Sequence, residues 1–434
     1  MVHFGHKAHD EAITKEGKDM ISKEKLRVDT ILITKSENQA LIWERRMVLV
    51  GACLYQCAMI GILLNCSGVL FAQMRHELGF TMSKVSLYNT LKSVTTALAA
   101  ASATALYFKS KKPVYLLLNQ LITISSFLLL TVGATGPLWY VSAVLCGLSS
   151  CIGSVAVPMI LTQWFPQNAG TATGIAMSFS GIGGAVCNPL CAKLIGIIGW
   201  KGAIYVLCII TLMLTIPGLV LMFQHSAPDT QMKKKEKVTS VSDSTRPMPA
   251  TIFLISIILI GGSLGVTFAV NISMYAQSIG YSLTVGASMT TMIMIGNVCS
   301  KFLYGICCDK KGVWKATMGA LLAASVSVLC YIFLQNQMII LFAASLIYGC
   351  VYALSVVAIS RCCVTAYGEQ GSKRFLGIHT CINSVVMAGS SLMVGVLFDY
   401  FQSFTPVLII VFAAMCCSLV ACAVMEKRKL HEYS

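Results

Sequence analysis

The sequence predicts an all-α membrane protein with twelve transmembrane helices in two six-helix halves, and three observations predict it. First, the 434 residues are 56% hydrophobic and 11% charged, which is roughly half the charged fraction of an average soluble domain. Second, apolar runs recur along the whole chain, and each is near the ~20 residues that a helix needs to cross a bilayer. Third, one long polar segment, 225–249, separates six of these runs from the other six.

Each apolar run gives one predicted span, and polar or charged turns separate neighbouring spans. The twelve predicted spans are 47–71, 84–108, 113–133, 137–164, 169–195, 202–224, 250–277, 283–307, 314–334, 338–360, 375–398 and 405–425. The chain therefore divides into a polar tail (1–46), an N-terminal half (47–224), a basic linker (225–249), a C-terminal half (250–425) and a short tail (426–434). Two six-helix halves are typical of transporters built from parallel repeats.

The positions of the basic residues predict the orientation of the chain. Most of the 32 Lys and Arg residues fall in the two tails, the linker and alternate loops, and such residues are enriched on the cytoplasmic side of a membrane. Both termini are therefore expected in the cytoplasm, with the spans in the plasma (cell inner) membrane. The first 46 residues lack the apolar core of a secretory signal, and their acidic residues argue against a transit peptide.

The net charge of +15 predicts one partner and argues against another. Basic loops on one side of a membrane suit the anionic lipid of the cytoplasmic face. Nucleic acid is not an expected partner, because the basic residues are scattered over separate loops instead of gathered on one domain. The protein is expected to be a monomer.

The cysteines predict helix packing, not metal or redox chemistry. Most of the 19 lie inside apolar spans and none forms a CxxC pair, and free cysteine behaves as a small hydrophobe. No metal and no cofactor are therefore expected. The chain is not expected to be an enzyme, because no span or loop offers the nucleophile, base and acid that catalysis requires.

Charge inside the membrane is confined to two lysines, Lys92 in the second span and Lys301 in the eighth. None of the 17 acidic residues lies in the middle of a span. A charged side chain in hydrocarbon costs at least ~2.5–3.5 kcal/mol, so it usually faces a cavity, a partner or the interface. With no carboxylate partner on any span, the expected counter-ion is an anionic substrate. The alternative is that each lysine snorkels to the membrane surface.

The stretch 296–312, GNVCSKFLYGICCDKKG, places Lys301 on a defined helix face. Asn297, Lys301, Gly305 and Asp309 are spaced at four-residue intervals, so each turns only about 40° from the one before. Asn297 is therefore expected to contact the substrate beside Lys301.

Further polar side chains within the spans are candidate substrate contacts, because such groups need partners in hydrocarbon. They are Tyr55, Gln56, Tyr348, Tyr352, His379 and Asn383. Tyr348 and Tyr352 are one helical turn apart and would offer hydroxyls to a carboxylate, and His379 would titrate near neutral pH. Packing within the bundle is the alternative for each of them.

The end of the 296–312 stretch resembles a family motif. Gly305-x-x-x-Asp309-Lys310-x-Gly312 resembles the short loop motif of the major facilitator superfamily, whose other copy normally follows the second span. At that second place the chain lacks the motif's Gly and Asp, so this copy is degenerate. The resemblance implies the major facilitator fold and a gating or structural role for the four motif residues.

Within that superfamily, the eighth span resembles that of oxalate:formate antiporters and the related monocarboxylate transporters, where a basic residue stands four before the motif glycine. Lys301 occupies this position, and the Trp164–Phe165 turn and the Gly199–Trp200 pair are also similar to these families. Those antiporters carry another lysine in the eleventh helix, whereas 375–398 contains neither Lys nor Arg. One fixed cation in the C-terminal half suits one carboxylate better than two.

Together these patterns predict a secondary active transporter that moves a small organic anion, preferably a monocarboxylate, by alternating access, as antiport or proton-linked symport. The alternative is an exporter of neutral or lipophilic compounds, in which the lysines snorkel. A sensor or a membrane enzyme, the third class considered, has no motif in its favour.

Overall fold

The computed structural model describes residues 41–165, 168–224 and 249–432, which form helices joined by short turns, with no β-strand among them. The expectations for the N-terminal tail before residue 41 and for the linker residues 225–248 concern residues outside this part of the chain.

The N-terminal half forms one helical bundle. Its helices are the Leu41–Leu78 helix, which includes the π-helical segment η1 (Cys57–Leu64) and α2 (Asn65–Leu78), then α3 (Met82–Lys109), α4 (Lys112–Gly133), α5 (Leu138–Trp164) and α6 (Ala169–Phe223). The turn between α2 and α3 follows local chemistry, because Gly79 takes the left-handed conformation at the C-cap of α2. Thr81 then caps α3, its side chain accepting a hydrogen bond from the Lys84 amide at 3.2 Å.

The C-terminal half forms a second bundle. Its helices are α7 (Pro249–Val270), α8 (Ile272–Ser278), α9 (Leu283–Lys311), α10 (Val313–Phe333), α11 (Met338–Tyr348), α12 (Val351–Phe401) and α13 (Thr405–Glu432). Glycine allows the closest helix crossing in this bundle, between α9 and the end of α11. A Cβ built on Gly296 would lie 1.9 Å from the carbonyl oxygen of Leu346, so no larger residue fits there.

Ten helices among the described residues are long and apolar enough to cross a membrane. One of them, Gly170–Phe223, has 54 residues and turns at Gly199, whose φ is 72°, so it is long enough for two crossings. The 28 residues of α3 are also long enough for one. These lengths are consistent with the twelve spans that the sequence predicts.

Two positive-φ glycines fall in turns that the sequence predicts between spans. Gly199 has φ 72° and ψ 170° and separates two helices within α6, and Gly368 has φ 69° and ψ 177° and does the same within α12. One detail differs from the predicted spans: the tenth, expected as one helix over 338–360, is interrupted where α11 ends at Tyr348 and α12 begins at Val351.

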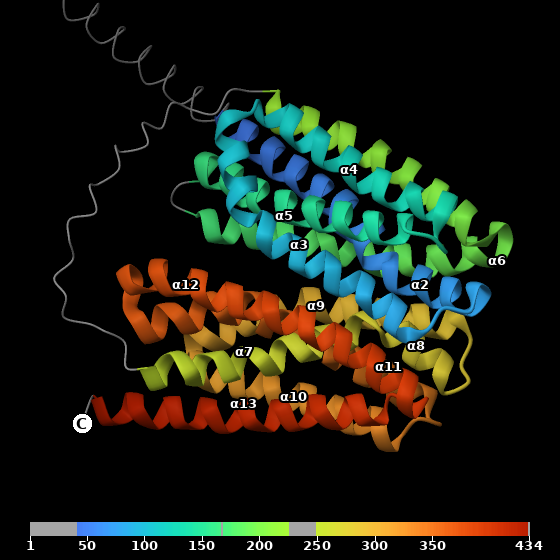
Figure 1. Cartoon of the computed structure of the whole chain (residues 1–434). Coiled ribbons are helices and arrows are strands. Elements are labelled where there is room, and N and C mark those ends of the chain that lie inside the picture. Colours follow the sequence, from blue (N-terminus) through green and yellow to red (C-terminus); the bar gives the residue numbers. More distant parts are fainter. Residues whose placement is uncertain (1–40, 166–167, 225–248, 433–434) are drawn as a thin grey trace, which may run out of the picture.

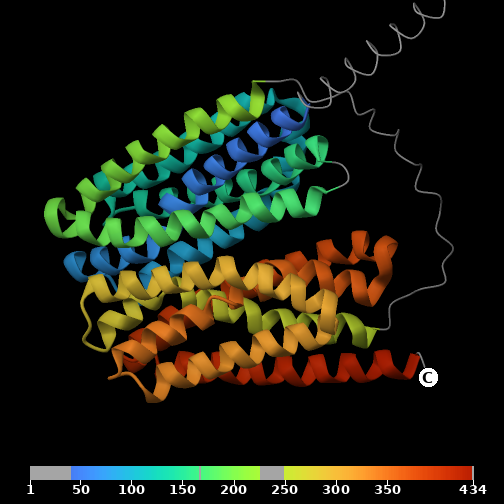
Figure 2. The ribbon, with the colours of Figure 1, turned by 180° about the vertical axis from the view of Figure 1, so that it is seen from behind.

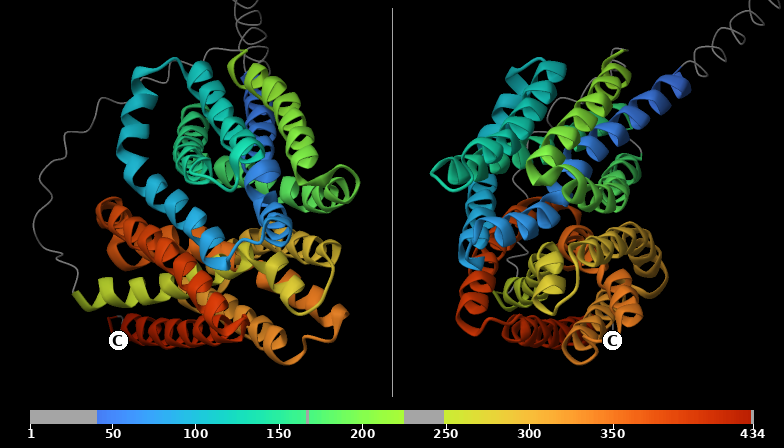
Figure 3. Two further views of the ribbon diagram at one scale, coloured as in Figure 1. Left: turned by 45° about the vertical axis from the view of Figure 1, so that its right-hand side comes forward. Right: turned by 90° about the vertical axis from the view of Figure 1, so that its right-hand side faces the viewer.

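The two bundles lie side by side with their helices running in the same general direction (Figures 1 and 2). We call one end of the molecule the tail end, because α7 begins there and α13 ends there (Figure 1). The other is the loop end, which holds the turns between α2 and α3 and between α12 and α13 (Figure 1). Figure 3 shows the two bundles as two groups of helices, one beside the other. They pack together mainly through α3 against α12 and α6 against α9.

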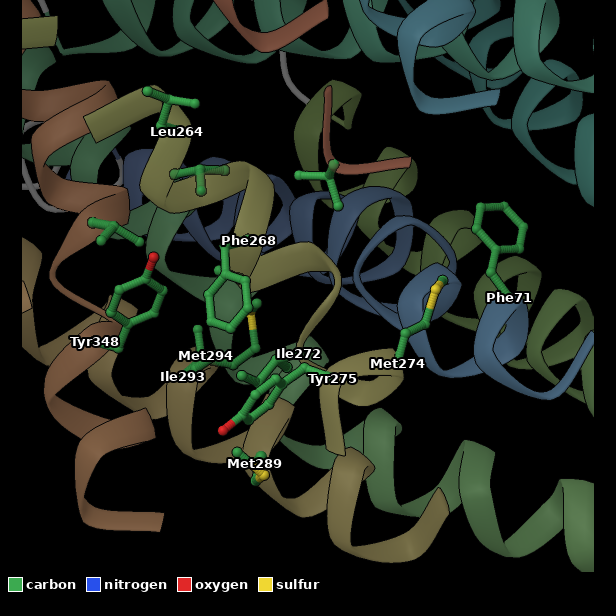
Figure 4. Packing of buried hydrophobic residues seen from close by; sticks show 14 of the residues in the cluster. Phe71, Leu264, Phe268, Ile272, Met274, Tyr275, Met289, Ile293, Met294 and Tyr348 are labelled. Atoms are coloured by element: carbon green, nitrogen blue, oxygen red, sulfur yellow. The ribbon is translucent and has the colours of Figure 1, made fainter. Parts of the chain in front are cut away.

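Each bundle has its own aromatic core. In the first bundle, the Trp139 ring packs against Phe71 and Tyr88, with ring centroids 5.2 and 4.9 Å apart. In the second, Phe268 contacts both Tyr275 and Tyr348, and Figure 4 shows these rings gathered between α7 and α11. Buried aromatic pairs contribute ~0.5–1.5 kcal/mol each beyond their buried area, and these rings stabilise each bundle from within.

Candidate functional site: a polar cavity between the bundles

A cavity of about 320 Å³ lies between the two bundles. Its volume lies within the ~300–1,000 Å³ that is usual for small-molecule sites. Both bundles contribute side chains, and most of these are amides or hydroxyls. The lining residues are Ile60, Leu64, Asn65, Ser67, Asn89, Lys92, Ser93, Thr96, Ser150, Thr267, Val270, Asn271, Tyr352, Ser384, Met387 and Ser391.

Helix α3 presents one polar face to this cavity. Asn89, Lys92, Ser93 and Thr96 all line it, and their spacing of three and four residues puts them on one side of a helix. Lys92 is half-buried, and its ammonium group has no hydrogen bond or ion pair within the described part of the chain. A cation is therefore available at the cavity wall.

Tyr352, at the start of α12, faces the same cavity from the second bundle. Its side chain is half-buried, and no described residue bonds to its hydroxyl. The same holds for the amide of Asn89 and the hydroxyl of Ser93 on α3. Four donor side chains at the cavity are therefore unengaged, counting Lys92.

Other polar groups of the lining are already engaged within the protein. Thr96 donates to the carbonyl of Gly147 at 2.9 Å, and the Asn65 amide donates to the carbonyl of Ser180 at 2.8 Å. None of the lining residues is Asp, Glu, His or Arg. The charge of the lining is thus a single positive charge, surrounded by neutral hydrogen-bonding groups.

The predicted contacts in the first span lie elsewhere, inside the N-terminal bundle. The hydroxyl of Tyr55 donates to the carbonyl of Leu116 at 3.1 Å and accepts from the Asn119 amide at 3.0 Å. Gln56 is fully buried, and neither polar atom of its side-chain amide has a hydrogen-bond partner among the described residues. Neither Tyr55 nor Gln56 lines the cavity.

Lys301 is half-buried on α9 and is not among the residues that line the cavity. Upstream on α9, Thr291 donates to the carbonyl of Ala185 on α6 at 3.3 Å. A Cβ on Gly181 of α6 would meet Val298 at 2.6 Å. Because helical residues three and four apart share a face, Lys301 continues this α6-facing side, one turn nearer the tail end.

Asn297 packs within the same crossing of helices. The residue is 3% exposed, and within the described part of the chain its side-chain oxygen has no hydrogen-bond partner. A Cβ on Gly349, at the end of α11, would lie 2.5 Å from the backbone nitrogen of Asn297. Asn297 therefore lies between α6 and α11, outside the cavity lining.

The remaining predicted contacts have partners in the C-terminal bundle. Tyr348 is fully buried and donates to the carbonyl of Gly265 at 3.0 Å, beside Phe268 in the aromatic core (Figure 4). His379 is buried, with its Nε2 3.1 Å from the hydroxyl of Tyr367. Asn383 accepts a hydrogen bond from Ser263. Of these candidates and Tyr352, only Tyr352 lines the cavity.

The motif after the eighth span lies at the tail end, within the C-terminal bundle. Asp309 pairs with Arg361 of α12 at 3.5 Å, and both are substantially exposed. Gly312 has a φ of 88°, a conformation that favours glycine, and it separates α9 from α10. Lys310 is exposed in the last turn of α9, and a Cβ on Gly305 would meet no atom within 4 Å.

Sequence reasoning missed most of the cavity lining, including Asn65, Asn89, Ser93 and Asn271. One signal was readable: Asn89, Lys92, Ser93 and Thr96 form a polar stripe at helical spacing in the second predicted span. Within the described residues, no group of three His, Cys, Asp or Glu side chains could hold a metal ion.

Comparisons with known proteins agree with this architecture. The family model described as Major Facilitator Superfamily matches residues 53–391. The chain is structurally similar to a mutant of the nucleoside transporter NupG, with a TM-score of 0.70 at 12% sequence identity, over 88% of this chain and 99% of that one. No curated protein sequence gives a significant match. Since the family model covers well over half of the sequence, this chain is a member of the Major Facilitator Superfamily, an integral membrane protein with a transporter fold.

Proposed function

We propose that this protein is a secondary active transporter that moves a small organic anion with one carboxylate, bound in the cavity between the bundles. The observation that carries the proposal is Lys92: it is the single charged residue of the lining and it has no partner among the described residues. Family membership supports the transporter class, and the cavity chemistry supports the substrate class.

The donors at the cavity match the needs of one carboxylate. An ionised carboxylate is an acceptor only, with about four lone-pair positions on its two oxygens. Lys92, Asn89, Ser93 and Tyr352 are four unengaged donor groups on the cavity wall. A substrate with two carboxylates would bring a second negative charge that no cation of the lining pairs, and desolvating an unpaired charge is costly. A monocarboxylate therefore fits the lining better than a dicarboxylate.

The cavity lining also contains the apolar side chains Ile60, Leu64, Val270 and Met387. They offer contact to a short hydrocarbon portion of the substrate. The volume of about 320 Å³ corresponds to roughly ten water molecules at ~30 Å³ each, so a small acid is favoured over a bulky lipophilic compound. We place the tail end in the cytoplasm of the plasma membrane, as the positive loops predict, and propose anion exchange or proton-linked symport as the coupling.

Counterflow in proteoliposomes tests the proposal. Vesicles containing the purified full chain are preloaded with lactate, and uptake of labelled lactate, formate, oxalate and the neutral nucleoside uridine is compared. We expect lactate or formate to be taken up in preference to oxalate and uridine. Uptake of uridine alone would overturn the anion proposal and leave a transporter of neutral compounds.

The variant Lys92→Gln tests whether Lys92 is the cation that pairs with the substrate carboxylate. Removing one partner of a desolvated ion pair costs ~3–5 kcal/mol, so uptake at low substrate concentration should fall by about a hundred-fold or more. The matched control is Lys84→Gln, two turns earlier on α3, where the ammonium is exposed and lies 3.7 Å from the centre of the Phe80 ring. Lys84→Gln should retain uptake, and equal losses in both variants would contradict the role of Lys92.

A further inference from the structure

Asp399, near the end of α12, bonds to the first turn of α3 in the other bundle. One oxygen of its carboxylate accepts from the Met82 amide at 2.7 Å, and the other accepts from the Ser83 amide at 2.8 Å. These two amides begin α3, and the first amides of a helix have no partner within the helix. Thr81 bonds only the Lys84 amide, so Asp399 supplies, from the other bundle, acceptors for two further amides of the first turn of α3.

The bond between Asp399 and α3 is favourable for two physical reasons. The carboxylate is ionised and accepts two amide hydrogens, and charge-assisted hydrogen bonds are about twice as strong as neutral ones. It also faces the positive end of the α3 dipole. Both terms depend on the bundles being together at the loop end, because Asp399 and α3 belong to different bundles.

The residues around Asp399 continue this contact toward the cavity. On α12, Ser391 donates to the carbonyl of Ser86 at 3.0 Å. One turn deeper, Thr90 donates to the carbonyl of Ala388 at 3.0 Å. Thr90 directly follows Asn89, a residue of the cavity lining. The α3–α12 contact therefore runs from the cavity to the loop end.

We propose that Asp399 is a gating residue of the transport cycle: its carboxylate holds the loop end closed in this conformation, and the α3 amides must be released before the cavity opens to that side. The inference rests on the alternating exposure expected of a transporter and not on the identity of the substrate. A purely structural role would require that the contact between Asp399 and α3 persist whichever side the cavity faces.

Thiol accessibility tests the gate without any substrate. The reporter is Ser93→Cys in the cavity, labelled with a membrane-impermeant maleimide from each side of the membrane, in intact cells and in inside-out vesicles. The same chain without Ser93→Cys gives the background from the native cysteines. With Asp399 present, we expect the reporter to react mainly from the side of the tail end.

In Asp399→Asn, loss of the charge and of one acceptor oxygen should raise the labelling rate from the loop-end side by about ten-fold or more. Asp399→Ala should raise it further, because both amides lose their acceptor. Labelling that continues from the tail-end side shows that the variant is folded. The matched control is Glu426→Gln, because Glu426 pairs with Lys315 inside one bundle and its loss should leave labelling from the loop-end side unchanged.

The proposal is overturned if the Asp399 variants, still labelled from the tail-end side, remain as protected from the loop-end side as the parent chain. It is also overturned if Glu426→Gln opens the loop end as much as Asp399→Asn. Neither result depends on which compound is transported, so failure of the gate and failure of the anion proposal are distinguished by separate measurements.

Discussion

Lys92 on α3 and Tyr352 on α12 line one cavity from opposite bundles, and neither side-chain head group has a partner among the described residues. A ligand that accepts from both would connect the two bundles through itself. Its binding free energy would then differ between conformations that bring the two groups together and conformations that separate them. A ligand shifts a conformational equilibrium only through such a difference, so a ligand held by both groups would couple its binding to movement of the bundles.

Replacing Tyr352 by Phe removes one donor and leaves the ring in place. A hydrogen bond to a charged group contributes ~1.5–3 kcal/mol, so we expect the KM for carboxylate uptake to rise by about ten-fold or more. Initial rates of uptake over a range of substrate concentrations measure this change.

The matched control is Tyr348→Phe, one turn earlier, because the hydroxyl of Tyr348 is bonded to the carbonyl of Gly265 in the core. That variant should lose ~0.5–1.5 kcal/mol of stability with no change in KM. A raised KM in Tyr348→Phe and none in Tyr352→Phe would place the substrate on the other side of α11 and α12.

Replacing Lys92 and replacing Lys301 should have different effects on the equilibrium binding of the carboxylate. Lys92 lines the cavity and Lys301 does not, so Lys92→Gln should abolish stabilisation of the purified protein by the carboxylate. Lys301→Gln should retain binding within about three-fold, because an unaltered cavity still holds the ligand and stabilises the folded state by mass action. Thermal unfolding in detergent, with and without substrate, measures both. The reverse order would identify the α6-facing side of α9 as the binding site.

The sequence was sufficient for the fold because crossing a bilayer imposes strong constraints. A span must be apolar over ~20 residues. Loops such as the one after α9 carry basic residues, which show where a span ends and on which side of the membrane the loop is expected. The exact positions of two breaks were harder to predict: Gly199 and Gly368 have non-helical backbone angles, and each separates two helices. A glycine in an apolar run has the same composition whether it turns the backbone or packs against a neighbour.

The site was predicted only in part, for a physical reason. Helical spacing tells which residues share a face, but not whether that face meets a cavity or another helix. Lys92 and Tyr352 face the cavity, whereas Tyr55 and Tyr348 satisfy their hydroxyls on backbone carbonyls within one bundle. Tyr352, Tyr55 and Tyr348 are all polar groups within predicted spans. Only the tertiary packing of the helices decides which of them faces the cavity and which is bonded inside a bundle.

Two glycines of α9 should respond differently to alanine. A Cβ at Gly296 would lie 1.9 Å from the carbonyl oxygen of Leu346, which is a backbone atom that cannot move aside. Gly296→Ala should therefore force α9 and α11 apart, with a loss of ~1–3 kcal/mol or more, as overpacked cores show. A Cβ at Gly305 would meet no described atom of another element within 4 Å, and Gly305→Ala should be neutral or slightly stabilising, since alanine is the better helix former.

Thermal unfolding of the two glycine variants in detergent, together with their yield in the membrane, provides the comparison. Gly305→Ala serves as the control for the substitution itself, since both positions are on the same helix. Equal stability of the two variants would contradict the close crossing of α9 and α11.

Replacing Tyr55 tests whether this buried polar residue stabilises the N-terminal bundle or binds substrate. Its hydroxyl donates to the carbonyl of Leu116 and accepts from Asn119, so Tyr55→Phe leaves a buried amide without an oxygen acceptor. Such an unsatisfied group costs ~1–3 kcal/mol. Adding Asn119→Leu removes the unpaired donor, so the double variant should lose less stability than the sum of the single changes. If Tyr55→Phe instead raises the KM at unchanged stability, Tyr55 contacts the substrate in another conformation of the cycle.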